Sequence, residues 1–221
     1  MRTTLFLVRH GVTAANQEDR FAGRSGEPLH PDGIRQMRSL GDRLQGLGLA
    51  AIHSGPLPRT RESATILGQA LGLPVHTEAG FNEMAIPHWD SLAKDEIRRR
   101  FGDQYPVWKA TPHRFQAPGC ETLAAVQARA VQAAEALADR YPGQAALVVS
   151  HLIVLRCLIL HYQGLPLDDF RAIRCDNSAV WVVQGLGTRE PTCFPLAGPK
   201  SAAPAVADLA GPASAAGMPP P

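Results

Sequence analysis

Residues 3–11 of the chain read TTLFLVRHG, an apolar run that ends in a basic turn. Thr3–Val8 is rich in β-forming residues and predicts a buried strand. Ala145–Val149 is fully apolar, predicts a central strand, and runs into Ser150 and His151. Both strands therefore end at a histidine. Because ligands in open α/β sheets bind at the carboxyl ends of strands, we expect His10 and His151 at one edge of the sheet.

The rest of the chain alternates between strand and helix patterns. Further strands are expected at Leu49–His53, Val75–Thr77 and Ala179–Gln184. The expected helices run from Ile34 to Gly46 or Gly48, and over Pro58–Leu71, Asp90–Phe101, Gln104–Lys109, Glu121–Tyr141 and Leu152–Gln163. This alternation predicts an α/β fold, a single three-layer domain with a mostly parallel central sheet flanked by helices.

Composition excludes several classes of protein. The 221 residues are 45% hydrophobic, which is enough to bury a core and excludes global disorder. A net charge of +2 gives no reason to expect a nucleic-acid or membrane-surface partner. The four cysteines form no C-x-x-C pair, so we expect no structural metal and a reduced, cytoplasmic setting. Ser150, His151 and Arg156 interrupt the most apolar stretch, so no membrane span is expected.

The C-terminal segment differs in composition from the rest. Residues 188–221 are rich in proline, alanine and glycine and show no helical or strand period. Because proline lacks an N–H group and has a fixed φ, we expect a disordered tail there and a folded domain over residues 1–187. An exposed edge strand in that domain could pair with a second copy, so both a monomer and a homodimer stay open.

Two arginines complete a candidate anion site. Arg9 directly precedes His10, and Arg59 follows the loop after the expected strand Leu49–His53. Guanidinium groups match phosphate oxygens bidentately, and a neutral imidazole is a good nucleophile near pH 7. Gly11 removes a Cβ where the main chain would approach the anion. The pattern suits a dianionic phosphate group.

These residues carry a family resemblance. Arg9–Asn16 resembles the R-H-G-x-T-x-x-N signature of the histidine phosphatase superfamily, also called phosphoglycerate mutase-like. Other segments similar to the family follow in register between Thr3 and Gln184: Arg20–Ser25, Ser54–Ala64, Pro118–Thr122, Val148–His151 and Asp176–Ser178.

The resemblance implies a role for each matching residue. His10 would attack phosphorus and become a phosphohistidine, and Arg9, Arg59 and His151 would stabilise the phosphoryl oxygens. Glu83 would protonate the leaving group and then activate water. The resemblance implies no cofactor and no metal, because these side chains supply the positive charge. The expected substrate-binding residues are Gly11, Thr13, Asn16, Gly23 and Leu152.

Three alternatives stay open for the activity. A short cap insertion, about residues 82–118, resembles the phosphatase branch and implies hydrolysis of a small phosphorylated metabolite. A mutase of the phosphoglycerate type is the second alternative. The third is a non-catalytic phosphate-binding module, because Leu152 stands where the family commonly has glycine. Cys120 and Ala22 also depart from the residues that are frequent in the family.

Overall fold

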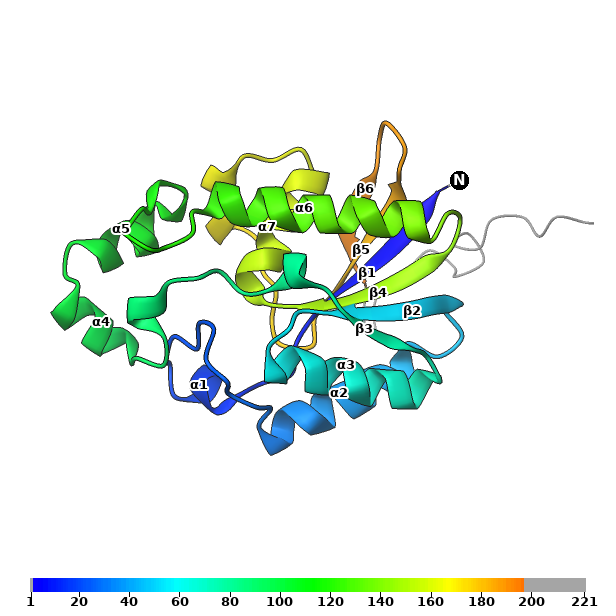
Figure 1. Ribbon diagram of the computed structural model, residues 1–221, viewed down its shortest axis with the longest axis horizontal. Helices are drawn as coiled ribbons and strands as arrows, with labels where there is room; N and C mark the ends of the chain where they lie inside the picture. Colours follow the sequence, from blue (N-terminus) through cyan, green and yellow to red (C-terminus); the bar gives the residue numbers. More distant parts are fainter. Residues whose placement is uncertain (1, 197–221) are drawn as a thin grey trace, which may run out of the picture.

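The computed structural model describes residues 2–196 and contains one six-stranded sheet (Figure 1). The strand order is β3-β2-β4-β1-β5-β6. Strands β1, β2, β3 and β4 run parallel to one another, whereas β5 is antiparallel to β1 and β6 is antiparallel to β5. The predicted α/β fold with a mostly parallel sheet is therefore confirmed. The strands are β1 (Thr3–Arg9), β2 (Leu49–Ser54), β3 (Val75–Thr77), β4 (Ala145–Ser150), β5 (Val180–Leu186) and β6 (Thr192–Pro195).

Helices cover both faces of the sheet and make it the middle layer of three. The alternation of side chains along β1 shows the two faces, because Leu5 and Leu7 belong to one apolar cluster, and Phe6 and Val8 to the other. The first cluster includes residues of α6 (Leu123–Arg140) and α7 (Leu152–Tyr162). The second includes residues of α2 (Pro31–Arg43) and α3 (Pro58–Leu71).

Local signals explain where these helices begin and end. Helix α3 starts with Pro58 at its first position and stops at Gly72, whose φ of 67° is left-handed. Helix α6 starts at Leu123 because the Thr122 hydroxyl accepts a hydrogen bond from the amide of Ala125 (3.2 Å).

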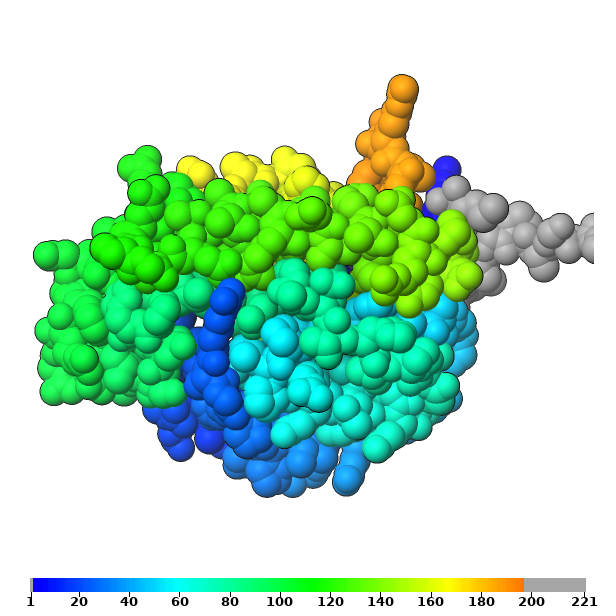
Figure 2. Space-filling model, in the orientation of Figure 1, coloured from blue at the N-terminus to red at the C-terminus, as the bar shows by residue number. Residues whose placement is uncertain are grey.

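The expected cap segment extends from one end of the sheet domain (Figure 1). It contains η2 (Pro87–Trp89), α4 (Lys94–Arg100), α5 (Gln104–Ala110) and η3 (Pro112–Arg114). The fully buried ring of Trp89 lies at its centre, within 6.1 Å (ring centroids) of Phe21, Trp108 and Phe115. In Figure 2 the blue N-terminal segments lie between the green cap segment and the cyan of α3. The remaining short helices are α1 (Ala14–Gln17), η1 (Ala79–Phe81) and η4 (Leu167–Arg171).

Helix α4 is shorter than predicted. The sequence pattern favoured a helix over Asp90–Phe101, but the structure has one only over Lys94–Arg100. Ser91 has a φ of 65°, which a right-handed helix does not allow, and Ala93 forms a β-bridge with Arg20. The residues before Lys94 therefore connect the cap segment to the loop after α1.

The prediction of a disordered tail from residue 188 is wrong for residues 192–195. They form β6, which pairs with β5. In this pair Trp181 lies opposite Pro195, and Gln184 lies opposite Thr192. Gly185 and Gly187 have φ values of 80° and 82°, so the chain can turn back on itself there. Pro195 ends an edge strand, where a missing N–H group is tolerated. Residues 197–221 lie outside the described part of the chain, and the prediction for them stays a prediction.

Within the described residues, every helix is either too short or too polar to cross a lipid bilayer.

Candidate functional site

The carboxyl ends of neighbouring strands bring the predicted histidines together. Strands β1 and β4 are adjacent and parallel, and the amide of His10 donates to the carbonyl of Ser150 (3.1 Å). His151 follows β4 directly and precedes the first residue of α7. The two imidazole rings lie edge to face with their centroids 5.3 Å apart. His10 is 4% exposed and His151 is fully buried.

The surroundings of His10 determine its tautomer and its charge. Its Nδ1 lies 2.7 Å from the carbonyl oxygen of Gly11, which can only accept a hydrogen bond. Nδ1 therefore carries the proton, and Nε2 keeps a free lone pair. Burial, with the added positive charges of Arg59 and Arg9, lowers the pKa of His10 well below its ordinary value. The ring is thus a neutral nucleophile near pH 7.

The buried Arg59 and the half-buried Arg9 flank the histidines, and neither forms a salt bridge with a carboxylate of residues 2–196. Arg59 donates from Nη2 to the carbonyl of Gly23 (2.6 Å), and Arg9 donates from Nη1 to the carbonyl of Cys175 (2.9 Å). Within residues 2–196, Nε of each arginine and both ring nitrogens of His151 are buried without a hydrogen-bond partner. Burial lowers the pKa of both arginines and of His151. Orphaned buried donors are costly, so this arrangement fits a bound anion.

Glu83 is the carboxylate of the site. It is 8% exposed, and its Oε2 lies 4.0 Å from Nδ1 of His151. Its Oε1 accepts a hydrogen bond from the amide of Met84 (2.7 Å). Burial raises the pKa of Glu83 above its ordinary value, although the charge of Arg59 and the Met84 amide act in the opposite direction. A raised pKa keeps more of the carboxyl protonated near neutral pH, as a general acid requires.

Thr13 and Asn16 close the first turn of α1. The amide of Thr13 donates to Oδ1 of Asn16 (3.1 Å), and the amide of Asn16 lies 3.4 Å from the Thr13 hydroxyl. In this reciprocal capping box the Thr13 hydroxyl caps the first turn of α1. The Nδ2 group of Asn16 donates to no residue between 2 and 196, so it can donate to a ligand.

The two predicted glycines are required by packing. A Cβ on Gly11 would lie 2.6 Å from the carbonyl oxygen of Gly33 at the start of α2. Gly11 is therefore a glycine because its main chain packs against the main chain of Gly33. The expectation from the sequence was a different one, a close approach of the main chain to an anion. Gly23 has a φ of 52°, and a Cβ there would overlap the carboxylate of Asp90. The main-chain carbonyl of Gly23 is the acceptor for Arg59.

Leu152, the last of the predicted residues, opens α7 directly after His151. Its partly buried side chain packs against the apolar cluster that contains α6 and α7. A leucine at this position therefore adds core contacts that a glycine would lack.

Two residues support the site although the sequence assigned them no role. Asn177 donates from Nδ2 to the carbonyl of His10 (2.9 Å) and to Oδ1 of Asn16 (3.2 Å). The hydroxyl of Ser63 accepts from the amide of Gly11 (3.2 Å) and donates to the carbonyl of Arg59 (2.7 Å). Asn177 stands in the family-like segment Asp176–Ser178, which was the available signal. Ser63 lies one helical turn after Arg59 in the family-like segment Ser54–Ala64, which was the available signal for it.

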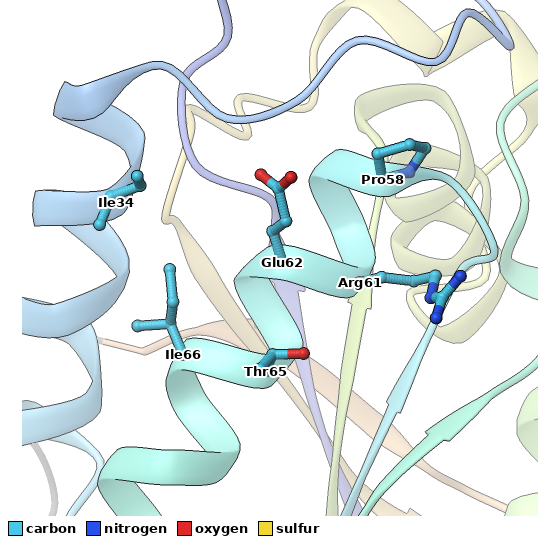
Figure 3. Close-up of a pocket in the computed structure, with 6 residues that line it drawn as sticks. All are labelled: Ile34, Pro58, Arg61, Glu62, Thr65 and Ile66. Atoms are coloured by element: carbon cyan, nitrogen blue, oxygen red, sulfur yellow. The ribbon is translucent and has the colours of Figure 1, made fainter.

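A separate groove lies between α2 and α3 and contains none of the predicted residues. Figure 3 shows Ile34 on one helix and the other five lining residues on the next, with Glu62 and Ile66 in the space between the two helices. The groove has a volume of about 430 Å³ and is lined by Ile34, Pro58, Arg61, Glu62, Thr65 and Ile66. Within residues 2–196, no group of three His, Cys, Asp or Glu side chains is arranged to hold a metal ion.

Comparisons with known proteins identify a family and several similar proteins. The model of the histidine phosphatase superfamily (branch 1) matches residues 5–190. The chain is 29% identical over 179 residues to "Phosphoserine phosphatase 1" of Hydrogenobacter thermophilus, covering 81% of this chain and 85% of that protein. It is 33% identical over 181 residues to "Probable phosphoglycerate mutase GpmB" of Klebsiella pneumoniae, covering 80% and 82%. The solved structure of Bacillus stearothermophilus YhfR superposes with a TM-score of 0.79 at 30% identity, covering 82% and 90%.

Proposed function

The chain belongs to the histidine phosphatase superfamily, and from this membership we propose that it is a phosphomonoesterase. It hydrolyses a small phosphorylated metabolite through a phosphohistidine on His10. One observation carries the proposal: around a neutral imidazole lie buried nitrogens of Arg9, Arg59 and His151 that have no hydrogen-bond partner among residues 2–196. A phosphate dianion would satisfy these donors and place phosphorus within reach of Nε2.

The first half of the reaction transfers the phosphoryl group to His10. Nε2 attacks phosphorus, the bond from phosphorus to the ester oxygen breaks, and Glu83 gives its proton to that oxygen. Arg9, Arg59 and His151 stabilise the charge that spreads over the phosphoryl oxygens. The hydrogen bond from Nδ1 to the Gly11 carbonyl holds the ring in the reactive tautomer.

The second half returns the enzyme to its starting state. Glu83, now a carboxylate, takes a proton from water while the water oxygen attacks phosphorus. The bond between phosphorus and Nε2 breaks, and inorganic phosphate leaves. Because two guanidinium groups and an imidazole carry the charge stabilisation, the proposed reaction needs no metal ion.

A mutase is the second candidate, because a relative at 33% identity carries the name of a probable phosphoglycerate mutase. Hydrolysis is favoured by the cap segment. Cofactor-dependent mutases of this family have an arginine and a tyrosine shortly after the acid, whereas Met84–Ser91 contains neither. The two reactions differ in the final acceptor of the phosphoryl group.

The test uses a set of phosphorylated metabolites and p-nitrophenyl phosphate in the presence of EDTA. We expect release of inorganic phosphate and acid-labile phosphate trapped on the protein, both lost in His10→Ala and kept in His161→Ala, a change at an exposed residue. Phosphate that stays on carbon would favour the mutase. Binding of phosphoesters without turnover would favour the phosphate-binding module. Activity that EDTA abolishes and a divalent ion restores would contradict the proposed mechanism.

A further inference from the structure

Glu121 lies in the family-like segment Pro118–Thr122, to which the proposed reaction gives no role. Its Oε1 accepts a hydrogen bond from Nε of Arg129 (2.8 Å). Its Oε2 accepts from Nη2 of Arg24 (2.9 Å), Nη2 of Arg129 (3.1 Å) and the amide of Ala85 (2.8 Å). The amide of Glu121 in turn donates to the carbonyl of Ala85 (2.9 Å).

Glu121 is therefore a second carboxylate near the site, but it is not a second acid. Burial alone would raise its pKa, but the hydrogen bonds from Arg129 and Ala85 outweigh burial, and the pKa of Glu121 lies below its ordinary value. A carboxylate held ionised by two guanidinium groups cannot supply a proton near neutral pH. Its surroundings and those of Glu83 shift the two pKa values in opposite directions.

The same two arginines also bind the main chain of Glu83. Arg24 donates from Nε to the carbonyl of Glu83 (2.8 Å), and Arg129 donates from Nη2 to the same oxygen (3.2 Å). Arg129 further donates from Nη1 to the carbonyl of Gly80 (2.8 Å). One carbonyl oxygen is thus held between the loop after α1 and the helix α6.

We propose that Arg24, Arg129 and Glu121 form a clamp that positions Glu83 for proton transfer. This inference rests on the proposed function, in which Glu83 is the acid. The three are positioning residues. The two arginines bind the carbonyl of Glu83, and Glu121 binds the amide of Ala85 in the same segment. Glu121 orients the two guanidinium groups, and they fix the Glu83 carbonyl, since a charge-assisted hydrogen bond is roughly twice as strong as a neutral one.

The clamp matters because Glu83 lies in a segment without helix or strand. Residues 82–86 follow η1 and precede η2, so no regular hydrogen-bond ladder holds them. The Glu83 carboxyl itself accepts only the amide of its neighbour Met84 among residues 2–196. Its distance to the leaving oxygen therefore depends on where the main chain is held. A misplacement of about 1 Å can cost about 100-fold in rate.

The clamp also acts on the Glu83 carboxyl through charge. The groups that face it are His151 at 4.0 Å and the guanidinium groups of Arg59, Arg129 and Arg9. Arg129 is one of the positive charges that oppose the effect of burial on the pKa of Glu83. Removing this charge is expected to raise the pKa of Glu83 further.

The test compares two leaving groups in Arg24→Lys and Arg129→Lys, which keep the charge but lose the fork of donors. An alkyl phosphate needs protonation of its leaving oxygen, whereas p-nitrophenyl phosphate releases a stable phenolate. We expect the single-turnover rate of phosphoryl transfer to His10 to fall on the order of 100-fold for the alkyl ester, within the range of acid catalysis, and only slightly for p-nitrophenyl phosphate. Arg140→Lys, an exposed residue of the same helix as Arg129, is the control.

An equal loss in the rate of phosphoryl transfer from both esters, or no loss from either, overturns the clamp. The Arg24 side chain is 35% exposed and that of Arg129 is 22% exposed, so we expect Arg24→Lys to disturb folding less than Arg129→Lys. A wild-type chain that forms no phosphohistidine shows instead that the proposed function has failed.

A second readout does not depend on turnover. The 13C signal of the Glu83 carboxyl, assigned by its loss in Glu83→Gln, gives its pKa directly in glutamate-labelled protein. Arg129→Met should raise that pKa, because Arg129 is one of the positive charges that act to lower it. An unchanged pKa overturns the coupling between Arg129 and Glu83, whether or not the chain is active.

Discussion

Gly55 lies directly against the imidazole of His151. A Cβ added at Gly55 would stand 3.2 Å from Nε2 of His151 and 2.7 Å from the carbonyl oxygen of Phe81. That carbonyl cannot move freely, because it also accepts a hydrogen bond from the Ser150 hydroxyl (2.8 Å). The position of His151 therefore depends on the absence of a side chain at the start of the loop between β2 and α3.

Replacing this glycine should disturb catalysis and stability together. Gly55→Ala is expected to displace His151, to lower kcat on the order of 100-fold, and to destabilise the fold by about 1 to 3 kcal/mol. Thermal melting and steady-state kinetics measure the two effects. Gly26→Ala is the matched control, because a Cβ there meets no atom within 4 Å. Equal effects of the two substitutions would show that the contact with His151 is unimportant.

The raised pKa of Glu83 predicts the pH dependence of the first chemical step. The acid must be protonated to release an alkoxide, so the rate should fall as pH rises through the pKa of Glu83, which burial holds above its ordinary value. Glu83→Gln should lower the rate by about 100-fold or more and remove this alkaline limb. Single-turnover kinetics with an alkyl phosphate measure it. An alkaline limb that persists in Glu83→Gln would assign it to another group.

The sequence predicted those parts of the fold that local patterns determine. Apolar runs placed β1 and β4, and Pro58 and Gly72 marked the ends of α3, because these signals lie within a few residues of one another. The same strands carried His10 and His151 to one edge. Contacts between distant segments had no such signal. The hydrogen bonds that join Arg24, Glu121 and Arg129 span up to 97 positions.

The C-terminal hairpin shows where composition misleads. Proline and glycine indicated disorder from residue 188, yet two left-handed glycines make the turn that returns β6 to β5. The antiparallel direction of β5 also had no signal in its own residues, since the mostly apolar pattern of Val180–Leu186 fits a strand in either direction. Pairing partners of a short edge strand depend on the whole sheet, which single-segment patterns do not describe.

Removing β6 should destabilise the domain. Phe194 and Leu196 pack against the apolar cluster of α2 and α3, and Gln163 donates from Nε2 to the Cys193 carbonyl (3.1 Å). Full burial of a phenylalanine is worth up to about 3 kcal/mol, and Phe194 is partly buried. A chain ending at Gly187 should therefore melt several degrees below a chain ending at Leu196. It should also self-associate in sedimentation experiments, because β5 becomes an exposed edge. Identical melting and sedimentation of the two chains would show that β6 contributes nothing.

The buried histidines predict that stability falls in mild acid. The pKa of His10 and of His151 is well below the ordinary value, mainly through burial, and the pKa of buried His53 is lowered to about 4. Below pH about 6.5 the unfolded chain takes up protons that the native protein does not bind, so the free energy of unfolding decreases as pH falls. The raised pKa of Glu83 has the opposite effect on the free energy of unfolding, but Glu83 is one group and the histidines are three.

The size of this effect can be assigned to single residues by denaturant unfolding between pH 7 and 5.5. Each buried histidine contributes up to about 1.4 kcal/mol per pH unit, so His151→Gln should reduce the slope of stability against pH by about that amount. His161→Gln, at an exposed residue of the same helix, should leave the slope unchanged. Sulfate, which is a dianion at both pH values, should protect wild type more at pH 5.5 than at pH 7, because a bound anion beside His151 favours its protonated form. An unaltered slope in His151→Gln would show that His151 takes up protons in the native protein as it does in the unfolded chain, and the neutral cluster that the geometry implies would have to be given up.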